Sequence, residues 1–149
     1  TTETIDVQEV LENILALVAR SMAAKDFAIE TEYIGTRLIL PSKCASSLAL
    51  VLNELVLNSM EHGFAGRTHG KITLYVSETA EAFTLLFAND GASLPENFGK
   101  AARKSLGLTI IKTLVEGDLA GTVVIKNRKE GGVVAEICIP RRVVDLVED

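Results

Sequence analysis

The sequence predicts an α/β protein, a two-layer sandwich in which helices pack on one face of a mixed, mainly antiparallel sheet. One observation supports this fold class and a second supports a single domain. Segments with helical spacing are interspersed with pairs of short segments in which apolar and polar residues alternate. The chain has 149 residues, 48% of them hydrophobic, with no internal repeat and no low-complexity linker. One domain with a full-sized core is therefore expected.

The N-terminal part is predicted to form a helix followed by two strands. A capping box begins at Asp6 and apolar residues then follow helical spacing, so a helix is expected over about residues 6–24. The segments FAIETEY and TRLILP lie on either side of Gly35 and are short, β-branched and alternating. They predict a hairpin, or two adjacent strands, ending at Pro41.

The next predicted helix, over residues 42–63 and opened by Ser42, carries a polar stripe. This helix is apolar almost all round, yet Glu54, Asn58 and Glu61 follow one another at i, i+4 and i+7 and share one face. Burying a carboxylate costs several kcal/mol unless it is paired or contacts a metal. Packing alone does not explain such a stripe, so it is the best candidate for a site.

The rest of the chain is predicted to add two strand pairs and a third helix. KITLYVS and AFTLLFA alternate and are separated by a short turn, so they should be antiparallel neighbours. Residues 89–104 lack periodicity and predict a loop of about fifteen residues, a length that usually serves function. A helix is expected from Ser105. GTVVIKN and VVAEICIP, joined at Gly131 and Gly132, predict a final hairpin, and residues 141–149 an exit segment.

Charge and composition exclude several classes of protein. The net charge of −5 argues against a basic face for nucleic acid or an anionic membrane. No uninterrupted apolar run approaches the roughly 18 residues of a membrane span, and the first residues do not resemble a signal peptide, so a cytoplasmic location is expected. Cys44 and Cys138 are isolated in the sequence and indicate buried thiols rather than a disulfide or metal site.

Three motifs carry a resemblance to a known family. NELVLNSMEHG, NDGASLP and SLGL, in this order and spacing, resemble the ATP-binding catalytic domain of sensor histidine kinases, in the superfamily that includes gyrase and MutL. The similarity extends over roughly Ile5 to Pro140 and implies a single domain of the Bergerat type over residues 1–149, with a core over about 5–140. LPSKCASSLALVLNEL is most similar to the subgroup with a Glu-x-x-x-Asn helix and a short lid.

The resemblance assigns roles on the polar helix. Asn58 is implied as a ligand of Mg²⁺ together with triphosphate oxygens. Glu54, one turn earlier, is implied to hold a metal-bound water or to orient the attacking group, and capping of a loop amide is the structural alternative. His62 matches a residue near the phosphates, although an imidazole that complements the helix dipole is an equal alternative.

NDGASLP is implied to form the base pocket. Alignment on Gly91 and Leu94 places Asn89 where the family's aspartate accepts the adenine amino group. A neutral amide still accepts this bond, at a loss of about 1 kcal/mol relative to a charged acceptor, and we hypothesise that it relaxes discrimination against guanine. Asp90 is expected to point to the other side of the strand.

Two further departures from the family pattern concern the base pocket. Ser93 replaces the second glycine of the motif, so a left-handed backbone there would cost about 1 kcal/mol or more. Val133 stands where the family often has a threonine near the base. Both put the affinity for nucleotide in doubt without removing the part of the site that binds metal and phosphate.

SLGL is implied to bind phosphate at the start of a helix, where unpaired amides and the helix dipole favour anions. This cradle comprises Ser105, Leu106, Gly107 and Leu108. Simple capping is the alternative for a serine at this position. Lys104 is chosen over Lys100 and Arg103 as a phosphate contact because it adjoins the cradle, with a solvated basic cluster as the alternative. Residues 91–104 would then act as a lid.

The implied function is that of a protein histidine kinase domain that binds ATP and Mg²⁺. It would transfer the γ-phosphoryl group to a histidine on a separate phosphoacceptor and dimerisation domain of the same kinase, with a response regulator downstream. His62 and His69 are the only histidines and neither suits this role, so the acceptor domain is expected before Thr1 and the domain alone should not autophosphorylate. The domain is expected to bind no nucleic acid. It is also expected to make no direct contact with a membrane, even if the whole protein is a membrane-bound sensor of which this domain is the cytosolic part.

Two other functions stay open. An anti-sigma-type serine kinase has a similar fold and asparagine helix, and would act as a free-standing domain on a protein substrate. A degenerate interaction module would have lost catalysis through the changes at Asn89, Ser93 and Val133, and would bind little or no ATP.

Overall fold

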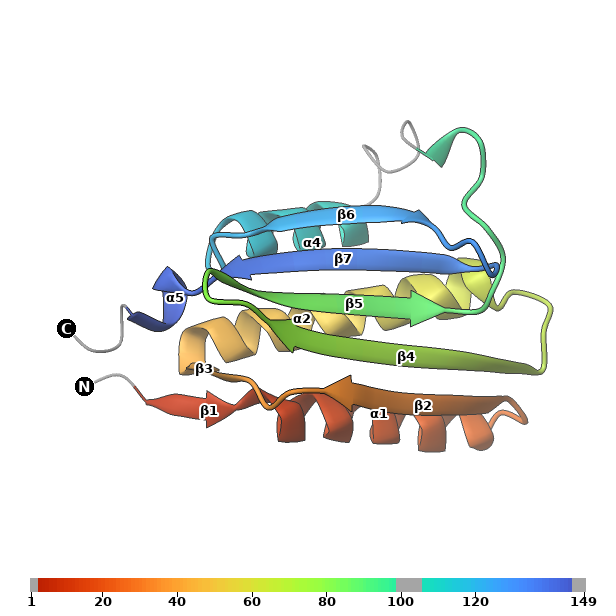
Figure 1. Cartoon of the computed structure of the whole chain (residues 1–149). Helices are drawn as coiled ribbons and strands as arrows, with labels where there is room; N and C mark the ends of the chain where they lie inside the picture. Colours follow the sequence, from red (N-terminus) through yellow and green to blue (C-terminus); the bar gives the residue numbers. More distant parts are fainter. Residues whose placement is uncertain (1–2, 99–105, 146–149) are drawn as a thin grey trace.

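A computed structural model describes residues 3–98 and 106–145, and its centre is a five-stranded sheet of order β2-β4-β5-β7-β6 (Figure 1). The strands are β2 (Ala28–Gly35), β4 (His69–Glu78), β5 (Ala82–Asn89), β6 (Thr122–Asn127) and β7 (Val133–Pro140). β2 runs parallel to β4, and the other pairs are antiparallel. The predicted mixed, mainly antiparallel sheet is confirmed, as are the hairpins β4–β5 and β6–β7.

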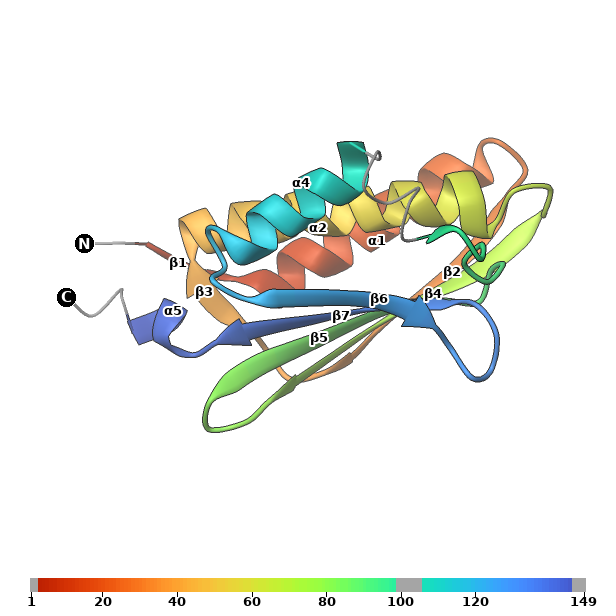
Figure 2. The ribbon, with the colours of Figure 1, turned by 90° about the horizontal axis from the view of Figure 1, so that it is seen from above.

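Three helices pack on one face of this sheet (Figure 2). They are α1 (Val7–Ala23), α2 (Ser42–Asn58) and α4 (Leu106–Glu116). As predicted, Asp6 caps α1, because its Oδ1 accepts from the Gln8 N–H at 3.1 Å. Apolar residues at helical spacing, such as Leu11 and Leu15, meet the inward-facing alternate residues of the strands, and this produces the two-layer sandwich.

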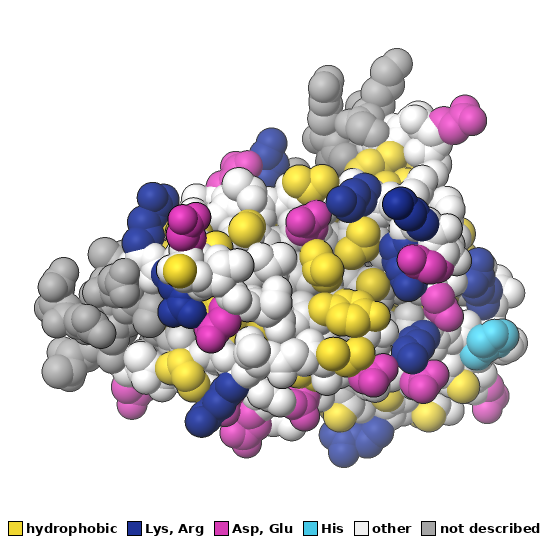
Figure 3. Space-filling view, in the orientation of Figure 1, with side chains coloured by type: hydrophobic (Ala, Val, Ile, Leu, Met, Phe, Trp, Pro, Cys, Tyr) yellow, Lys and Arg dark blue, Asp and Glu magenta, His cyan; other side chains and the backbone are white. Residues whose placement is uncertain are grey.

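The other face of the sheet carries no helix among the described residues and mixes apolar with charged side chains (Figure 3). Tyr75 and Leu86 are cross-strand partners on β4 and β5 and contribute to its apolar part. Lys126 Nζ lies 3.3 Å from Glu136 Oε2 across β6 and β7. Alternation along each strand therefore separates a core face from a face open to solvent.

The segments around Gly35 do not form the predicted hairpin or adjacent strands. β2 pairs with β4, whereas β3 (Ile39–Pro41) pairs antiparallel with β1 (Thr4–Asp6) in a separate two-stranded sheet. The Thr36 N–H donates to the Val76 carbonyl at 3.0 Å, so the chain still follows β4 after Gly35 instead of turning back. The prediction was wrong because alternation identifies strands but does not select their partners.

The helix predicted over residues 42–63 is present but changes its geometry near the end. α2 is followed by η1, a π-helical turn over Ser59–Gly63, in which the Phe64 N–H donates to the Ser59 carbonyl at 2.8 Å. The wider turn displaces the residues after Asn58 around the helix axis. π-Helical turns of this kind are frequent at functional sites.

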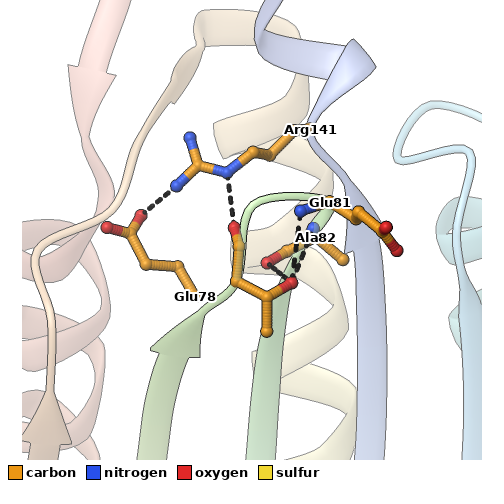
Figure 4. A network of polar contacts seen from close by, with 5 residues as sticks. Glu78, Glu81, Ala82 and Arg141 are labelled. Carbon is orange, nitrogen blue, oxygen red and sulfur yellow. Dashed lines mark hydrogen bonds and ion pairs between the residues drawn. The ribbon is translucent and has the colours of Figure 1, made fainter.

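Arg141 holds the β4–β5 turn at the opposite end of the sheet from the β6–β7 turn (Figures 1 and 4). Its Nε donates to the Thr79 carbonyl at 2.7 Å and its Nη2 to Glu78 Oε2 at 2.9 Å. Its guanidinium carbon lies 4.9 Å from the centre of the Phe83 ring. The predicted exit segment begins with this anchor and the short helix α5 (Arg142–Asp145), and its last four residues lie outside the described residues.

Both cysteines are free, as predicted, with Cys44 buried and Cys138 half-buried. Burial raises the pKa of the Cys44 thiol, with the Asp118 carboxylate adding to the effect. Among residues 3–98 and 106–145, no helix combines the length and the apolar composition needed to cross a bilayer.

The backbone of β5 and the turn between β6 and β7 meet at Gly132 with no space for a side chain. Gly132 has a φ of +87°, and a Cβ there would lie 2.0 Å from the Asn89 carbonyl oxygen. Arg128 closes the turn, because its N–H donates to the Gly132 carbonyl at 2.9 Å and its Nη1 donates to the Asn89 carbonyl at 3.0 Å. This contact fixes the backbone at the end of β5.

Replacing Gly132 should therefore be much more costly than replacing its neighbour. Gly131 also has a positive φ, +101°, but nothing lies within 4 Å of a Cβ there. Gly131→Ala should lower the free energy of unfolding by about 1 kcal/mol through backbone strain alone. Gly132→Ala should lose about a further 1–3 kcal/mol to the clash. Urea denaturation followed by circular dichroism checks this difference, and equal midpoints for the two variants would contradict the close contact.

A second polar contact joins the start of α2 to the turn after α4. The buried Ser47 donates from Oγ to Asp118 Oδ2 at 2.6 Å, and Lys43 Nζ lies 3.5 Å from Asp118 Oδ1. The Ser47 hydrogen bond, assisted by the Lys43 charge, lowers the pKa of Asp118. The ionised carboxylate is therefore more favourable in the folded chain than in the unfolded chain.

Ser47→Ala should lower the free energy of unfolding by about 1–2 kcal/mol at neutral pH, because it removes a hydrogen bond to a charged group. Ser46→Ala is the matched control, since Ser46 lies next to it in α2 and is exposed. The contribution of Asp118 is complete above its unfolded pKa and is lost as the pH falls through its lower folded pKa. Urea denaturation should thus give a smaller gap between the variants at about pH 3 than at about pH 7. A gap independent of pH would count against this contact.

Candidate functional site

A cavity of about 710 Å³ lies where the end of α2 and η1 meets the sheet and the loop after β5. It is lined by Leu55, Asn58, Ser59, Glu61, His62, Gly63, Ala65, Phe87, Asn89, Ala92, Ser93, Leu94, Pro95, Phe98, Leu108, Ile125, Val133 and Ala135. These residues come from segments far apart in the sequence. Residues of all three predicted motifs therefore meet in one place, although the third motif contributes only Leu108.

The walls of the cavity are mainly apolar and its polar groups are of two kinds. Asn89 and Ser59 are buried, with 5% and 2% of their surfaces exposed. Glu61 and His62, on η1, have side chains that are 67% and 80% exposed. The half-buried Asn58 lies on α2 one residue before η1. Such a cavity suits a ligand with a flat apolar body, a polar edge directed inward and a charged part directed to solvent.

Asn89 is held by hydrogen bonds on both sides of its amide. Its Nδ2 donates to Ser59 Oγ at 2.9 Å, and its Oδ1 accepts from the Gly91 N–H at 3.0 Å. Ser59 Oγ in turn donates to the Leu55 carbonyl at 3.0 Å. The strand β5, the π-helical turn and the loop after β5 are therefore connected through one buried side chain.

The loop after β5 lies directly on the helix end. The Ala92 N–H donates to the Gly63 carbonyl at 2.8 Å, and a Cβ at Gly91 would lie 2.4 Å from that carbonyl oxygen. The Leu94 N–H donates to Asn127 Oδ1 at 2.7 Å. Glycine at position 91 thus allows the close approach that closes this side of the cavity.

Asp90 points away from the cavity, as strand alternation predicted. Its Oδ1 accepts from the Lys71 N–H at 2.8 Å, and Arg67 Nη1 donates to its carbonyl at 3.1 Å. Asp90 therefore connects the end of β5 to the start of β4, and it is absent from the lining of the cavity.

The polar stripe of the second helix differs in part from the expectation. Asn58 lines the cavity, but Glu54 does not, although it is half-buried one turn earlier on α2. Glu61 lines the cavity and is exposed, so the predicted burial of a three-residue stripe is wrong. The cause is that this helix face borders an opening to solvent and that the π-helical turn begins directly after Asn58.

Other predicted site residues fall into three groups. His62, Ser93, Leu94 and Leu108 line the cavity. Leu106 and Gly107 form the first turn of α4, where Leu106 is 75% exposed and neither residue lines the cavity. Lys104 and Ser105, with the weaker candidates Lys100 and Arg103, lie outside the described residues, so their part in the predicted phosphate cradle and lid is a sequence-based expectation.

Ser93 lies in the loop without the strain that its position in the glycine motif suggested. The non-glycine residues with positive φ among the described residues are Asp26 and Ala120, both far from this loop in the sequence. Serine at position 93 is therefore compatible with the loop conformation. Val133 lines the cavity with an apolar side chain, so it adds no hydrogen-bonding group there.

Sequence reasoning missed Ser59 and Arg128. Ser59 binds the Asn89 side chain, and Arg128 binds the Asn89 carbonyl. The sequence offers one weak signal for Ser59, a small polar residue directly after Asn58 in an apolar helix. It offers none for Arg128, whose role depends on the position of the β6–β7 turn.

No set of three His, Cys, Asp or Glu side chains within residues 3–98 and 106–145 is placed to hold a metal ion by itself. A metal bound at Asn58 would thus need most of its ligands from water and from a bound molecule. Mg²⁺ accepts such an arrangement, because it is often bound through few protein groups together with phosphate oxygens and water.

Comparison with known proteins places this geometry in a family. The family described as histidine kinase-like ATPase domain matches residues 8–135. The chain is 32% identical over 143 residues to the sensor histidine kinase PdtaS of Mycobacterium tuberculosis, and the aligned region covers 94% of this chain and 28% of that protein. It is 28% identical over 101 residues to blue-light-activated histidine kinase 2 of Erythrobacter litoralis, covering 67% of this chain and 29% of that protein. The chain thus spans less than a third of the length of these relatives.

Solved structures share the fold. The histidine kinase domain of the blue-light activated histidine kinase EL346 from Erythrobacter litoralis superposes with a TM-score of 0.76 at 24% identity, over 97% of this chain and 66% of that one. The catalytic domain of the histidine kinase ThkA gives 0.74 at 22% identity, over 94% and 97%. With the family match across most of its length, this chain belongs to the histidine kinase-like ATPase domain family and is homologous to the catalytic domains of sensor histidine kinases.

Proposed function

We propose that this domain binds Mg²⁺-ATP in the cavity and transfers its γ-phosphoryl group to a histidine of a phosphoacceptor and dimerisation domain. The observation that supports this proposal most strongly is that one cavity contains the buried Asn89 amide and also Asn58 on the bordering helix. The Asn89 amide suits the recognition of a base, and Asn58 suits the binding of a metal ion with its phosphate groups. A cavity of about 710 Å³ is also within the usual range for such ligands.

The base would lie between apolar walls with its polar edge at Asn89. Phe87, Ile125 and Val133 supply apolar surface from three neighbouring strands. Asn89 Oδ1 accepts one hydrogen bond, from the Gly91 N–H, and a carbonyl-type oxygen has a second lone pair. It can therefore accept the adenine amino group without losing its bond to the protein.

The triphosphate would extend along α2 and η1 toward solvent. Asn58 would supply an amide oxygen to Mg²⁺, and the ion would neutralise charge on the phosphate oxygens and hold them in place. His62 would contact the phosphates from η1, and Lys104 with residues 105–108 would also bind them. Glu54, one turn before Asn58, would orient the attacking imidazole or a metal-bound water.

We propose that the acceptor histidine lies outside this domain, and that the response regulator is a separate partner. The relatives are sensor histidine kinases of which this chain matches 28% and 29% of the length, so the remaining length has room for an acceptor domain. Transfer to a histidine there, followed by transfer to a response regulator in the cytoplasm, completes the proposed two-component role. Relatives named as histidine kinases also support histidine over the serine acceptor of an anti-sigma-type kinase.

A degenerate module is the second candidate, and the substitution that favours it is Asn89. A neutral amide in place of a carboxylate forms a weaker hydrogen bond to an amino group, by about 1 kcal/mol. The unstrained conformation of Ser93 and the intact hydrogen bonds of Asn89 favour a working site instead.

Calorimetric titration of the chain with a non-hydrolysable ATP analogue tests the proposal. Binding should require Mg²⁺, and Asn58→Ala should weaken it by about tenfold or more, because the metal loses its protein ligand. Asn53→Ala is the matched control, since Asn53 lies on the same helix, is exposed and does not line the cavity. No binding by the wild type at millimolar nucleotide would favour the degenerate module and would contradict the proposed function.

A further inference from the structure

The hydrogen bonds around Asn89 determine which end of its amide faces each neighbour. Ser59 Oγ gives its hydrogen to the Leu55 carbonyl at 3.0 Å, so it accepts from Asn89 Nδ2 at 2.9 Å. The Gly91 N–H can only donate, and it donates to Asn89 Oδ1 at 3.0 Å. Exchanging the oxygen and nitrogen of the amide would place donor against donor at Gly91 and acceptor against acceptor at Ser59.

The fixed amide retains capacity for a ligand in the cavity. A primary amide has two N–H groups and two lone pairs on its oxygen. Ser59 uses one N–H and Gly91 uses one lone pair. Asn89, which lines the cavity, therefore has one N–H and one oxygen lone pair that these two bonds do not use.

This pair matches the edges of two kinds of purine. The 6-amino group of adenine donates to Oδ1 while its ring N1 accepts from Nδ2. In a 6-oxopurine such as guanine or hypoxanthine, the N1–H donates to Oδ1 while O6 accepts from Nδ2. An ionised aspartate at this position would offer acceptors only, and it would repel the 6-oxo oxygen.

The other side chains near this amide do not restore discrimination. Leu94 and Val133 line the cavity and carry no hydrogen-bonding atoms, and Phe87 adds only a ring. Ser59 already donates to Leu55 and accepts from Asn89. Among the buried polar side chains that line the cavity, Ser59 and Asn89, the selection between 6-amino and 6-oxo purines therefore falls on Asn89.

We propose that the cavity accepts 6-oxopurine nucleotides as well as adenine nucleotides, and that Asn89 is the residue responsible. This inference rests on the proposed function and widens its substrate class from adenine nucleotides to purine nucleoside triphosphates.

The test compares the binding of Mg²⁺-ATP and Mg²⁺-ITP by the chain in competition calorimetry. ITP is a sharper probe than GTP. A carboxylate can bind the 2-amino group of guanine together with its N1–H, and hypoxanthine lacks that amino group. The wild type should bind the two nucleotides with dissociation constants within about tenfold of each other. Asn89→Asp should retain ATP and bind ITP more than about tenfold more weakly than ATP.

Asn53→Asp is the matched control, because it adds the same charge at an exposed position of α2 outside the cavity, and it should leave the ratio unchanged. A wild-type preference for ATP above about tenfold overturns the inference and leaves the proposed function standing. Failure of both nucleotides to bind overturns both. If the ratio of the ITP and ATP dissociation constants is the same in the wild type and in Asn89→Asp, the role of Asn89 is overturned. If that variant does not fold, the wild-type ratio alone decides whether the cavity accepts 6-oxopurine nucleotides.

Discussion

The buried hydrogen bonds of Asn89 are the interaction on which the rest of the candidate site depends. The side chain connects β5 to Ser59 on the π-helical turn and to Gly91 in the following loop, while its carbonyl accepts from Arg128. A buried polar group of this kind is favourable only when its partners are all in place. The positions of the helix end, the loop and the β6–β7 turn are therefore coupled to one residue, and together they shape the cavity.

This arrangement separates two tasks within one cavity. The strands bring apolar side chains and a buried amide, which suit recognition of a base. The bordering helix brings Asn58 and the exposed residues Glu61 and His62, which suit a charged group in contact with solvent. Membership of the histidine kinase-like ATPase domain family gives this division a function. In our proposal the neutral residue at position 89 changes which purines the base end of the cavity recognises, while Asn58 on the bordering helix serves the metal and phosphates.

Much of the fold follows from local patterns in the sequence. Helical spacing and the cap at Asp6 predicted α1, and strand alternation predicted the inward and outward faces of β4 and β5. The partner of β2 was mispredicted, because pairing between strands distant in sequence depends on where α1 and α2 pack. Periodicity also identified Asn58, but it assumed a regular α-helix and so misjudged the burial of Glu61. The sequence indicates Ser59 only weakly, and Arg128 gains its role entirely from tertiary contacts that no local pattern encodes.

The most direct test of the account is an NMR titration of the ¹⁵N-labelled chain with a Mg²⁺-bound ATP analogue. The side-chain NH₂ signal of Asn89 is assigned by its loss in Asn89→Asp, and the Gly91 amide by standard triple-resonance methods. The account predicts that both signals shift and saturate together with the side-chain NH₂ of Asn58. Nucleotide-induced shifts that leave Asn89 and Gly91 unchanged would contradict the placement of the base in this cavity.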